Sequence, residues 1–309
     1  MNGKPIIKPF LVCWSLVVLI FCSVSVNAQT ELPEKDLNFF KKNEAELQAL
    51  QKKLFATKHD SIKAKLNKDF VELWEKTLSA ELSWFYPFDS LNQVGRLVSP
   101  DETFRIINWN TYNNDGSHEY FGFIQTYDKK KKKYELFKLI DKSATVKNPE
   151  TYIGEPDKWF GMLYYKIIKS GDTYTLLGWD GNDKLTQKKF IDVLYFKDNG
   201  DPYFGKDIFN KIPKKNPRRV VFEYSSEIAM SLHYNEEKKM IIFDHLAPRD
   251  PLMEGMFQYY GPDFSYDAFD LSKGKWKYVP DVDIKNIKNK KDNVVHKENK
   301  KEKPVYTPK

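Results

Sequence analysis

Cysteine is nearly absent from this chain of 309 residues, because Cys13 and Cys22 are its two cysteines and both lie close to the N-terminus. No disulfide is predicted for residues 29–309, so their stability must come from buried apolar area. That part of the sequence also has no Asn-x-Ser/Thr acceptor for glycans. It contains no apolar run of the roughly 20 residues that a membrane-spanning helix needs. These absences exclude thiol chemistry, a disulfide-stapled scaffold and a helical membrane protein for residues 29–309.

The first 28 residues have the features of an export signal. Two lysines precede the apolar run Phe10–Val26, and residues 26–28 fit a signal-peptidase site. An uncleaved N-terminal anchor is one alternative. A lipoprotein attached through Cys22 is another, but Phe21 stands where such signals place a small residue. We therefore expect residues 1–28 to be a cleaved signal peptide and the protein to be exported, periplasmic or secreted.

Familiar catalytic and metal motifs are missing as well. The sequence has no G-x-S-x-G, no H-E-x-x-H, no glycine-rich phosphate loop and no dinucleotide fingerprint. Residues 272–275 match S-x-x-K, but their glycine predicts a hairpin tip and not the helical turn that this motif requires. His233 and His245 fall on neighbouring predicted strands, yet strand geometry places them more than about 10 Å apart. No metal site, cofactor or catalytic residue is predicted from these motifs.

The positive charge is concentrated near the two ends of the chain. Of the net charge of +7, Lys4 and Lys8 contribute two, and residues 283–309 contribute five through nine lysines and four acids. The part between is close to neutral, so no nucleic-acid partner is predicted. Residues 283–309 have few large apolar side chains, and we expect a disordered basic tail there. The five lysines Lys129–Lys133 predict a solvated hairpin tip, with an acidic envelope polymer such as lipopolysaccharide as the alternative partner.

Residues 29–82 show the periodicity of helices. Residues 58–60 interrupt the pattern, which predicts two amphipathic helices arranged as a hairpin. Two interpretations stay open, because the pair can pack on its own domain or form a coiled coil with a partner. The recurring apolar residues are Leu37, Phe40, Leu47, Leu50 and Leu54, then Ile62, Leu66, Phe70, Leu73 and Trp74.

Residues 83–282 read as a predominantly antiparallel β domain of about eight to ten strands. Short aromatic and β-branched runs alternate with turn sequences such as Asn114-Asp115-Gly116 and Asn199-Gly200. Residues 180–181 predict a type I′ turn, and the alternation over Glu227–Tyr234 predicts a strand with one buried face. The expected fold class is α+β, with a sandwich, a barrel and a partial propeller left open.

Three short segments resemble known families. Ser99-Pro100-Asp101 before the predicted strand at 104–108 is similar to the blade start of TolB-like β-propellers, with Glu102 in the place of the usual glycine and no repeat of about 40–45 residues downstream. Residues 175–183 and 243–250 resemble uncharacterised exported proteins of Gram-negative bacteria. This second resemblance implies a location in the cell envelope and carries no known activity.

Polar side chains crowd together between residues 244 and 270. Aspartate and proline there fit ordinary turns. Clustered carboxylates also suit calcium, although the usual calcium-loop spacing is missing. Two carboxylates beside aromatic residues would suit a glycoside hydrolase. The candidate ligand-binding residues are Asp244, His245, Arg249, Asp250, Glu254, Asp263 and Asp267.

Two functional hypotheses follow. The first is an exported, non-catalytic envelope protein that binds a protein partner or an envelope polymer through its helices or basic tail, and it predicts an exposed apolar patch on the helical pair. The alternative is a secreted carboxylate-based hydrolase acting on glycans, built on carboxylates from the region Asp244–Asp270. It predicts that a cleft with aromatic walls brings together at least two of Asp244, Asp250, Glu254, Asp263 and Asp267.

Overall fold

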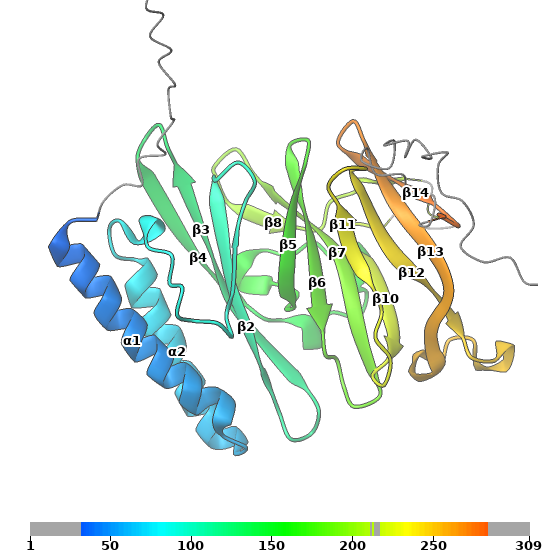
Figure 1. Cartoon of the computed structure of the whole chain (residues 1–309), viewed down its shortest axis with the longest axis horizontal. Coiled ribbons are helices and arrows are strands. Elements are labelled where there is room, and N and C mark those ends of the chain that lie inside the picture. Colours follow the sequence, from blue (N-terminus) through cyan, green and yellow to red (C-terminus); the bar gives the residue numbers. More distant parts are fainter. Residues whose placement is uncertain (1–31, 211, 213–216, 284–309) are drawn as a thin grey trace, which may run out of the picture.

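The computed structural model describes residues 32–210, 212 and 217–283. The predicted export signal and almost all of the predicted basic tail lie outside this range. None of the helices in the described part is long and apolar enough to cross a membrane. The predicted α+β class is confirmed, with two N-terminal helices followed by antiparallel sheets (Figure 1).

The two helices form the predicted hairpin. Helix α1 spans Glu34–Ala56 and α2 spans Asp60–Leu78. Acidic residues in the first turn of each helix complement the positive end of the helix dipole. The chain leaves the helical conformation at Thr57, which is extended, and His59 precedes α2 in an extended conformation too. A short linker with the 3₁₀ turn η1 (Ser83–Phe85) then leads to the first strand.

Fourteen strands form three sheets in the described part of the chain. Sheet 1 contains β1 (Gly95–Val98), β2 (Phe104–Tyr112), β3 (His118–Asp128) and β4 (Lys133–Ile140), in that order. Sheet 2 has the order β10 (Val220–Ser225), β7 (Thr186–Phe196), β6 (Thr173–Asp180) and β5 (Leu163–Ser170), with β8 (Pro202–Phe204) also paired to β7. Sheet 3 has the order β11 (Leu232–Asn235), β12 (Met240–Pro248), β13 (Tyr260–Ser272), β14 (Lys275–Val279) and β9 (Phe209–Asn210).

The sheets stack as layers, with the helices covering the outer face of sheet 1 (Figure 1). Side chains that alternate along β2 show why. Phe104 and Ile106 enter the core between sheets 1 and 2, whereas Ile107 and Trp109 enter the core under the helices. Sheet 2 is likewise buried on both faces. Leu176 packs in the core between sheets 1 and 2, and the next residue, Leu177, packs in a third core between sheets 2 and 3. No closed barrel is formed by these strands.

Two details of the predicted β domain were wrong. The strand count was too low, because β8 and β9 have three and two residues and leave little pattern in the sequence. The strand predicted over Glu227–Tyr234 begins at Leu232, and the residues before it form turns in which Ile228 is exposed. The predicted glycine turns at Gly116 and Gly200 are confirmed, since both have positive φ.

The helices bury their apolar stripes on their own domain. Phe40, Leu47, Leu54, Phe70 and Trp74 are each at most 1% exposed. They pack with the linker and with β2 and β3 of sheet 1 in one core. The prediction of an exposed apolar patch on the helical pair was therefore wrong, because sheet 1 supplies the partner surface that the pattern requires.

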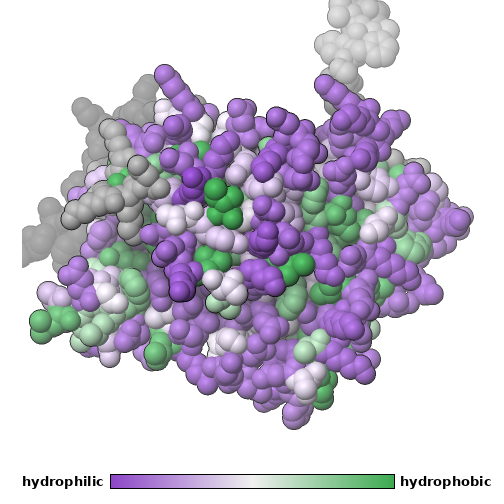
Figure 2. Space-filling model, turned by 180° about the vertical axis from the view of Figure 1, so that it is seen from behind, coloured by the Kyte–Doolittle hydropathy of each residue, from purple (hydrophilic) through white to green (hydrophobic). Residues whose placement is uncertain are grey.

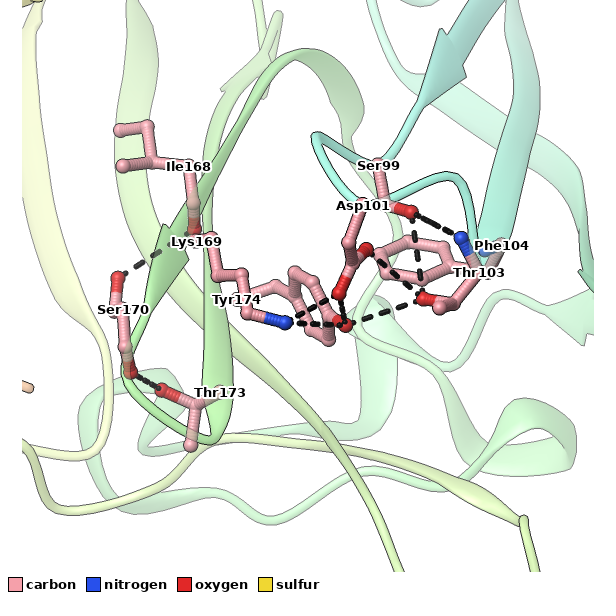
Figure 3. Close-up of polar contacts among 9 residues, drawn as sticks. All are labelled: Ser99, Asp101, Thr103, Phe104, Ile168, Lys169, Ser170, Thr173 and Tyr174. Carbon is pink, nitrogen blue, oxygen red and sulfur yellow. Dashed lines mark hydrogen bonds and ion pairs between the residues drawn. The ribbon is translucent and has the colours of Figure 1, made fainter.

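A polar cluster around Asp101, which we call the Asp101 clasp, connects the β1–β2 turn of sheet 1 to the β5–β6 hairpin of sheet 2 (Figure 3). The Asp101 carboxylate accepts hydrogen bonds from Tyr174 OH at 2.7 Å and Thr103 Oγ1 at 3.0 Å, and it forms an ion pair with Lys169. Burial acts to raise the pKa of Asp101, but these hydrogen bonds outweigh it and hold the pKa well below its usual range. The Ser-Pro-Asp segment thus serves as a contact between sheets.

A second polar cluster is fully buried within sheet 2, on the face that packs toward sheet 1. Arg219, just before β10, places its Nε 2.9 Å from Asp192 Oδ1 on β7, and both side chains are 0% exposed. Tyr164 OH donates to Asp192 Oδ2 at 2.9 Å and accepts from Trp159 Nε1 at 3.0 Å. The burial of this ion pair is thus compensated by additional hydrogen bonds.

Candidate binding cleft between sheets 2 and 3

Asp180 and Gly181 hold sheets 1 and 2 together and do not form the predicted type I′ turn. Asp180 accepts a hydrogen bond from Tyr120 OH at 2.6 Å, and burial raises the pKa of its carboxyl group. The positive φ belongs to Asn182. Gly181 is needed for another reason, because a Cβ there would lie 2.1 Å from the His118 ring nitrogen Nε2. This segment is therefore structural.

The predicted site residues on β12 and the β12–β13 connection are mostly engaged in local contacts. Asp244 accepts a hydrogen bond from the Ser231 backbone N–H at 2.6 Å. Asp250 caps the 3₁₀ turn η5 (Pro251–Met253) through a bond from the Leu252 N–H at 2.9 Å. Glu254 is exposed. These carboxylates fit the turn interpretation of the sequence.

Three of the predicted residues do come together. His245 Nδ1 lies 2.8 Å from Asp267 Oδ2, which also accepts a hydrogen bond from Tyr278 OH at 2.7 Å. The Asp263 carboxylate accepts from Ser265, and this bond, helped by His245, lowers its pKa. Asp267 is buried under its partners. Within the described ranges, no group of three or more His, Cys, Asp or Glu side chains is arranged to hold a metal ion.

The carboxylates do not converge as the hydrolase alternative requires. Asp263 lines a hollow beside Tyr259, and Arg249 lines the same hollow. The hydrogen bonds given above already engage the carboxylates of Asp244, Asp250 and Asp267. The positions of these groups therefore give the hydrolase alternative no support.

An aromatic cleft opens where sheets 2 and 3 separate, close to Asp244. Its volume is about 620 Å³, within the usual range of roughly 300–1,000 Å³ for ligand sites. The floor comes from four neighbouring strands of sheet 2, and the rim comes from the turns between β10 and β11. The lining residues are Tyr165, Trp179, Gln187, Lys189, Tyr224, Ser226, Glu227, Ile228, Ala229 and Met230.

Hydrogen bonds fix the aromatic walls of this cleft. Trp179 Nε1 donates to Gln187 Oε1 at 2.8 Å, and Gln187 Nε2 in turn donates to the Ile228 carbonyl at 3.0 Å. Tyr165 OH donates to the Leu232 carbonyl of sheet 3 at 3.0 Å, while its ring stays 40% exposed. Burial raises the pKa of Tyr224 to about 12, so its hydroxyl stays neutral. The rings are thus held in place before any ligand arrives.

Lys189 is the one cation among the lining residues. Its ammonium nitrogen lies 5.8 Å from the centre of the Tyr165 ring. Burial lowers the pKa of Lys189, and the attraction of Asp244 opposes this shift. Among the described residues, no hydrogen-bond acceptor or ion-pair partner lies within reach of its ammonium group. The cleft therefore presents a positive charge with unused donors between aromatic rings.

A second hollow adjoins the first and continues along the β12–β13 connection. It has a volume of about 580 Å³ and shares the strip 226–228 with the aromatic cleft. Beyond it, apolar side chains stand out from the surface, with Leu252 on the connection at 89% exposure and Phe264 on β13 at 94%. Phe264 also has a φ of +72°, which is strained for a bulky residue. Figure 2 shows apolar atoms at the lower left edge of a mostly hydrophilic surface, on the side of sheet 3.

Comparisons of the chain with protein-family models, with curated protein sequences and with solved structures gave no match. Sequence reasoning missed the cleft, although part of its signal was present. Trp179 and Tyr165 are amphipathic aromatics at strand ends, and Lys189 interrupts the apolar pattern of β7. Their meeting depends on strand pairing, because they lie on three different strands.

Proposed function

We propose that this protein is an exported, non-catalytic envelope protein that binds an envelope polymer in the cleft between sheets 2 and 3. The observation that carries the proposal is the pair of aromatic rings, Trp179 and Tyr165, which line the cleft and are held by hydrogen bonds at their polar ends. Sugar rings have apolar faces that suit stacking on such rings, and sugar hydroxyls suit the polar groups around them.

Two further features support this proposal. The N-terminal sequence has the pattern of an export signal, which would bring the protein to the polymers of the envelope. The cleft offers Gln187, Ser226 and Glu227 as polar contacts, but it does not combine a nucleophile with a base oriented by a third group. Such a site suits binding better than catalysis.

Isothermal titration calorimetry of residues 29–309 against a panel of neutral and acidic oligosaccharides tests the proposal. We expect at least one oligosaccharide to bind, and we expect Trp179→Ala and Tyr165→Ala each to weaken binding by roughly tenfold, as stacking contacts of about 1–1.5 kcal/mol are lost. The matched control is Tyr112→Ala, which removes an exposed tyrosine at the end of β2 in sheet 1. Equal weakening by all three variants, or no binding at all, would contradict the proposal.

A protein partner is the second candidate, and a separate observation favours it. Leu252, Met256, Phe257 and Phe264 are all exposed on or beside the β12–β13 connection. Contiguous exposed apolar side chains typically mark contact sites. The nearby acidic residues Asp250, Glu254 and Asp263 would suit a basic partner.

This candidate is tested by replacing Leu252 and Phe264 with serine together. We expect loss of proteins that co-purify with the wild-type chain from envelope extracts, with oligosaccharide binding unchanged. Ile62→Ser on α2, also an exposed apolar residue, is the control. Unchanged co-purification in the double variant would remove the candidate.

A further inference from the structure

The aromatic cleft contains one positively charged side chain, Lys189. Resting on the proposed function, we infer that the bound polymer contains acidic sugar units, pyranose rings with an oxyanion substituent, and that Lys189 holds this oxyanion while Trp179 or Tyr165 stacks on the ring. A neutral glycan would use the aromatic rings but would leave the ammonium group unpaired.

The unpaired state of Lys189 is the first step of the argument. An ammonium group in a half-buried site loses water, and this loss is unfavourable unless acceptors replace the water. Asp244 is near enough to attract the charge, but its carboxylate accepts the Ser231 N–H and forms no ion pair with Lys189. Among the described residues, Lys189 therefore has the attraction of Asp244 and the face of the Tyr165 ring, but no direct ion pair or hydrogen bond.

The second step is a comparison with the other lysines of sheet 2, which have hydrogen-bond or ion-pair partners. Lys188, the neighbour of Lys189 on β7, lies 2.8 Å from Asn182 Oδ1 and 3.6 Å from Glu223. Lys166 on β5 pairs with Glu236 at 2.7 Å, and Lys169 pairs with Asp101. The cation that lacks such a partner is the one that lines the aromatic cleft.

The geometry of the cleft makes the third step. Lys189 and the Trp179 ring lie on paired residues of adjacent strands, since Trp179 is the cross-strand partner of Lys189. Side chains of such a pair lie about 5 Å apart at Cβ, so a ring stacked on the indole brings its substituents within reach of the ammonium group. Hydrogen bonds from an ammonium group to an oxyanion are about twice as strong as neutral ones.

Calorimetric titrations with three matched probes test this inference. The probes are an oligogalacturonide, its carboxyl-reduced neutral counterpart and a sulfated galactan oligosaccharide. We expect the dissociation constant of an acidic probe to be at least tenfold lower than that of the neutral one. The carboxylate and sulfate arms identify which oxyanion is preferred, and tighter binding of either one than of the neutral probe supports the inference.

The variant Lys189→Met is expected to raise the dissociation constant of the acidic probe by at least tenfold and to leave that of the neutral probe within twofold. Lys188→Met is the matched control and should change neither value. Lys189→Gln, which keeps hydrogen-bond donors without the charge, provides a second variant should the methionine variant fold poorly. It should lose the acidic preference as well.

The outcomes separate this inference from the proposed function. Equal binding of neutral and acidic probes, unchanged by Lys189→Met but lost in Trp179→Ala, would overturn the acidic-sugar inference and leave the proposed function standing. Absence of binding of every probe at millimolar concentrations would overturn both.

Discussion

Sheet 2 presents two faces that are used in different ways. The face toward sheet 1 carries apolar packing, the Asp101 clasp and the buried pair of Asp192 and Arg219, and a hollow of about 560 Å³ opens at its edge beside Phe196 and the β3–β4 hairpin. The face toward sheet 3 is packed along most of its length but opens at one end into the aromatic cleft. Polar side-chain contacts therefore reinforce the packing toward sheet 1, whereas the hollow on the side of sheet 3 is lined by aromatic rings and Lys189.

Two cations of sheet 2 sharpen this comparison. Arg219 is completely buried and its guanidinium contacts Asp192 and the Pro149 carbonyl. Lys189 is half-buried, yet no acceptor in the described chain satisfies it. The buried Arg219 is thus paired directly, whereas the half-buried Lys189 has no direct acceptor among the described residues.

The largest effect is expected for Arg219→Met. Removing the guanidinium leaves the Asp192 carboxylate buried without its counter-ion, which should lower the free energy of unfolding by about 3–5 kcal/mol. Urea denaturation followed by tryptophan fluorescence measures this change. Arg218→Met is the control, since the adjacent side chain is partly exposed and should matter little. A loss below about 1 kcal/mol would show that the pair is not a main support of sheet 2.

A smaller effect is expected for Asp101→Asn in the clasp. The substitution removes the charge that Lys169 and Tyr174 bind, but Lys169 is itself 47% exposed, so solvent screens part of the interaction. We expect a loss of about 1–2 kcal/mol at neutral pH, measured by urea denaturation. Glu102→Gln is the control, because it breaks an exposed ion pair between the β1–β2 turn and Lys129 of the β3–β4 turn and should change stability by less than about 0.5 kcal/mol.

The stability difference between wild type and Asp101→Asn is also expected to depend on pH. Because the folded pKa of Asp101 lies below its unfolded value of about 3.9, its contribution is present above that value and is lost as the pH falls through the folded pKa. The stability difference between wild type and Asp101→Asn should therefore be constant near neutrality and shrink below about pH 4. A difference that instead widens in acid would contradict the lowered pKa.

Lys189→Met, like Arg219→Met, replaces a cation with an apolar side chain, but on the opposite face of sheet 2. Replacing an uncompensated, half-buried ammonium group with an apolar side chain should leave stability unchanged or raise it by up to about 1 kcal/mol. Thermal unfolding of the two variants side by side measures the contrast. A clear loss of stability in Lys189→Met would mean that Lys189 supports the fold as Arg219 does.

The smallest effect is expected for Phe264→Gly on β13. Glycine adopts positive φ without strain, and the relief of about 1 kcal/mol is partly offset by the greater entropy of glycine in the unfolded chain. We expect a net gain of about 0–1 kcal/mol, read from thermal unfolding. Leu252→Gly at a position without positive φ is the control and should give no gain. A loss in Phe264→Gly alone would indicate that the aromatic ring contributes contacts to the fold.

Local patterns explain which parts of this fold were predictable. The helical pair and hairpins such as β5–β6 follow from periodicity and turn residues within short stretches of sequence. The partner of the helices did not follow, because the apolar stripe of a helix is the same whether it faces sheet 1 or another protein. The short strand β9 was missed because its pairing with β14 joins residues far apart in the chain.

The site was less predictable for the same physical reason. The segment 244–267 was chosen because its polar residues are close in sequence, and part of it does border the second hollow through Arg249 and Asp263. The cleft that we propose instead draws Tyr165, Trp179 and Lys189 from separate strands, and their proximity arises when sheet 2 forms. A lysine without a partner is a property of three-dimensional surroundings and has no signature in a linear pattern.

The order of the layers has a consequence for assembly. Helices, sheet 1 and most of sheet 2 follow one another along the chain, so each layer can form on the one made before it as synthesis proceeds from the N-terminus. Strand β14 is the exception, since Trp276 pairs with Phe209 and donates a hydrogen bond to Thr175 Oγ1 at 2.7 Å in sheet 2. A chain truncated before Lys275 would keep its early layers and leave sheet 3 unfinished, with β9 and the edge of β13 open to aggregation.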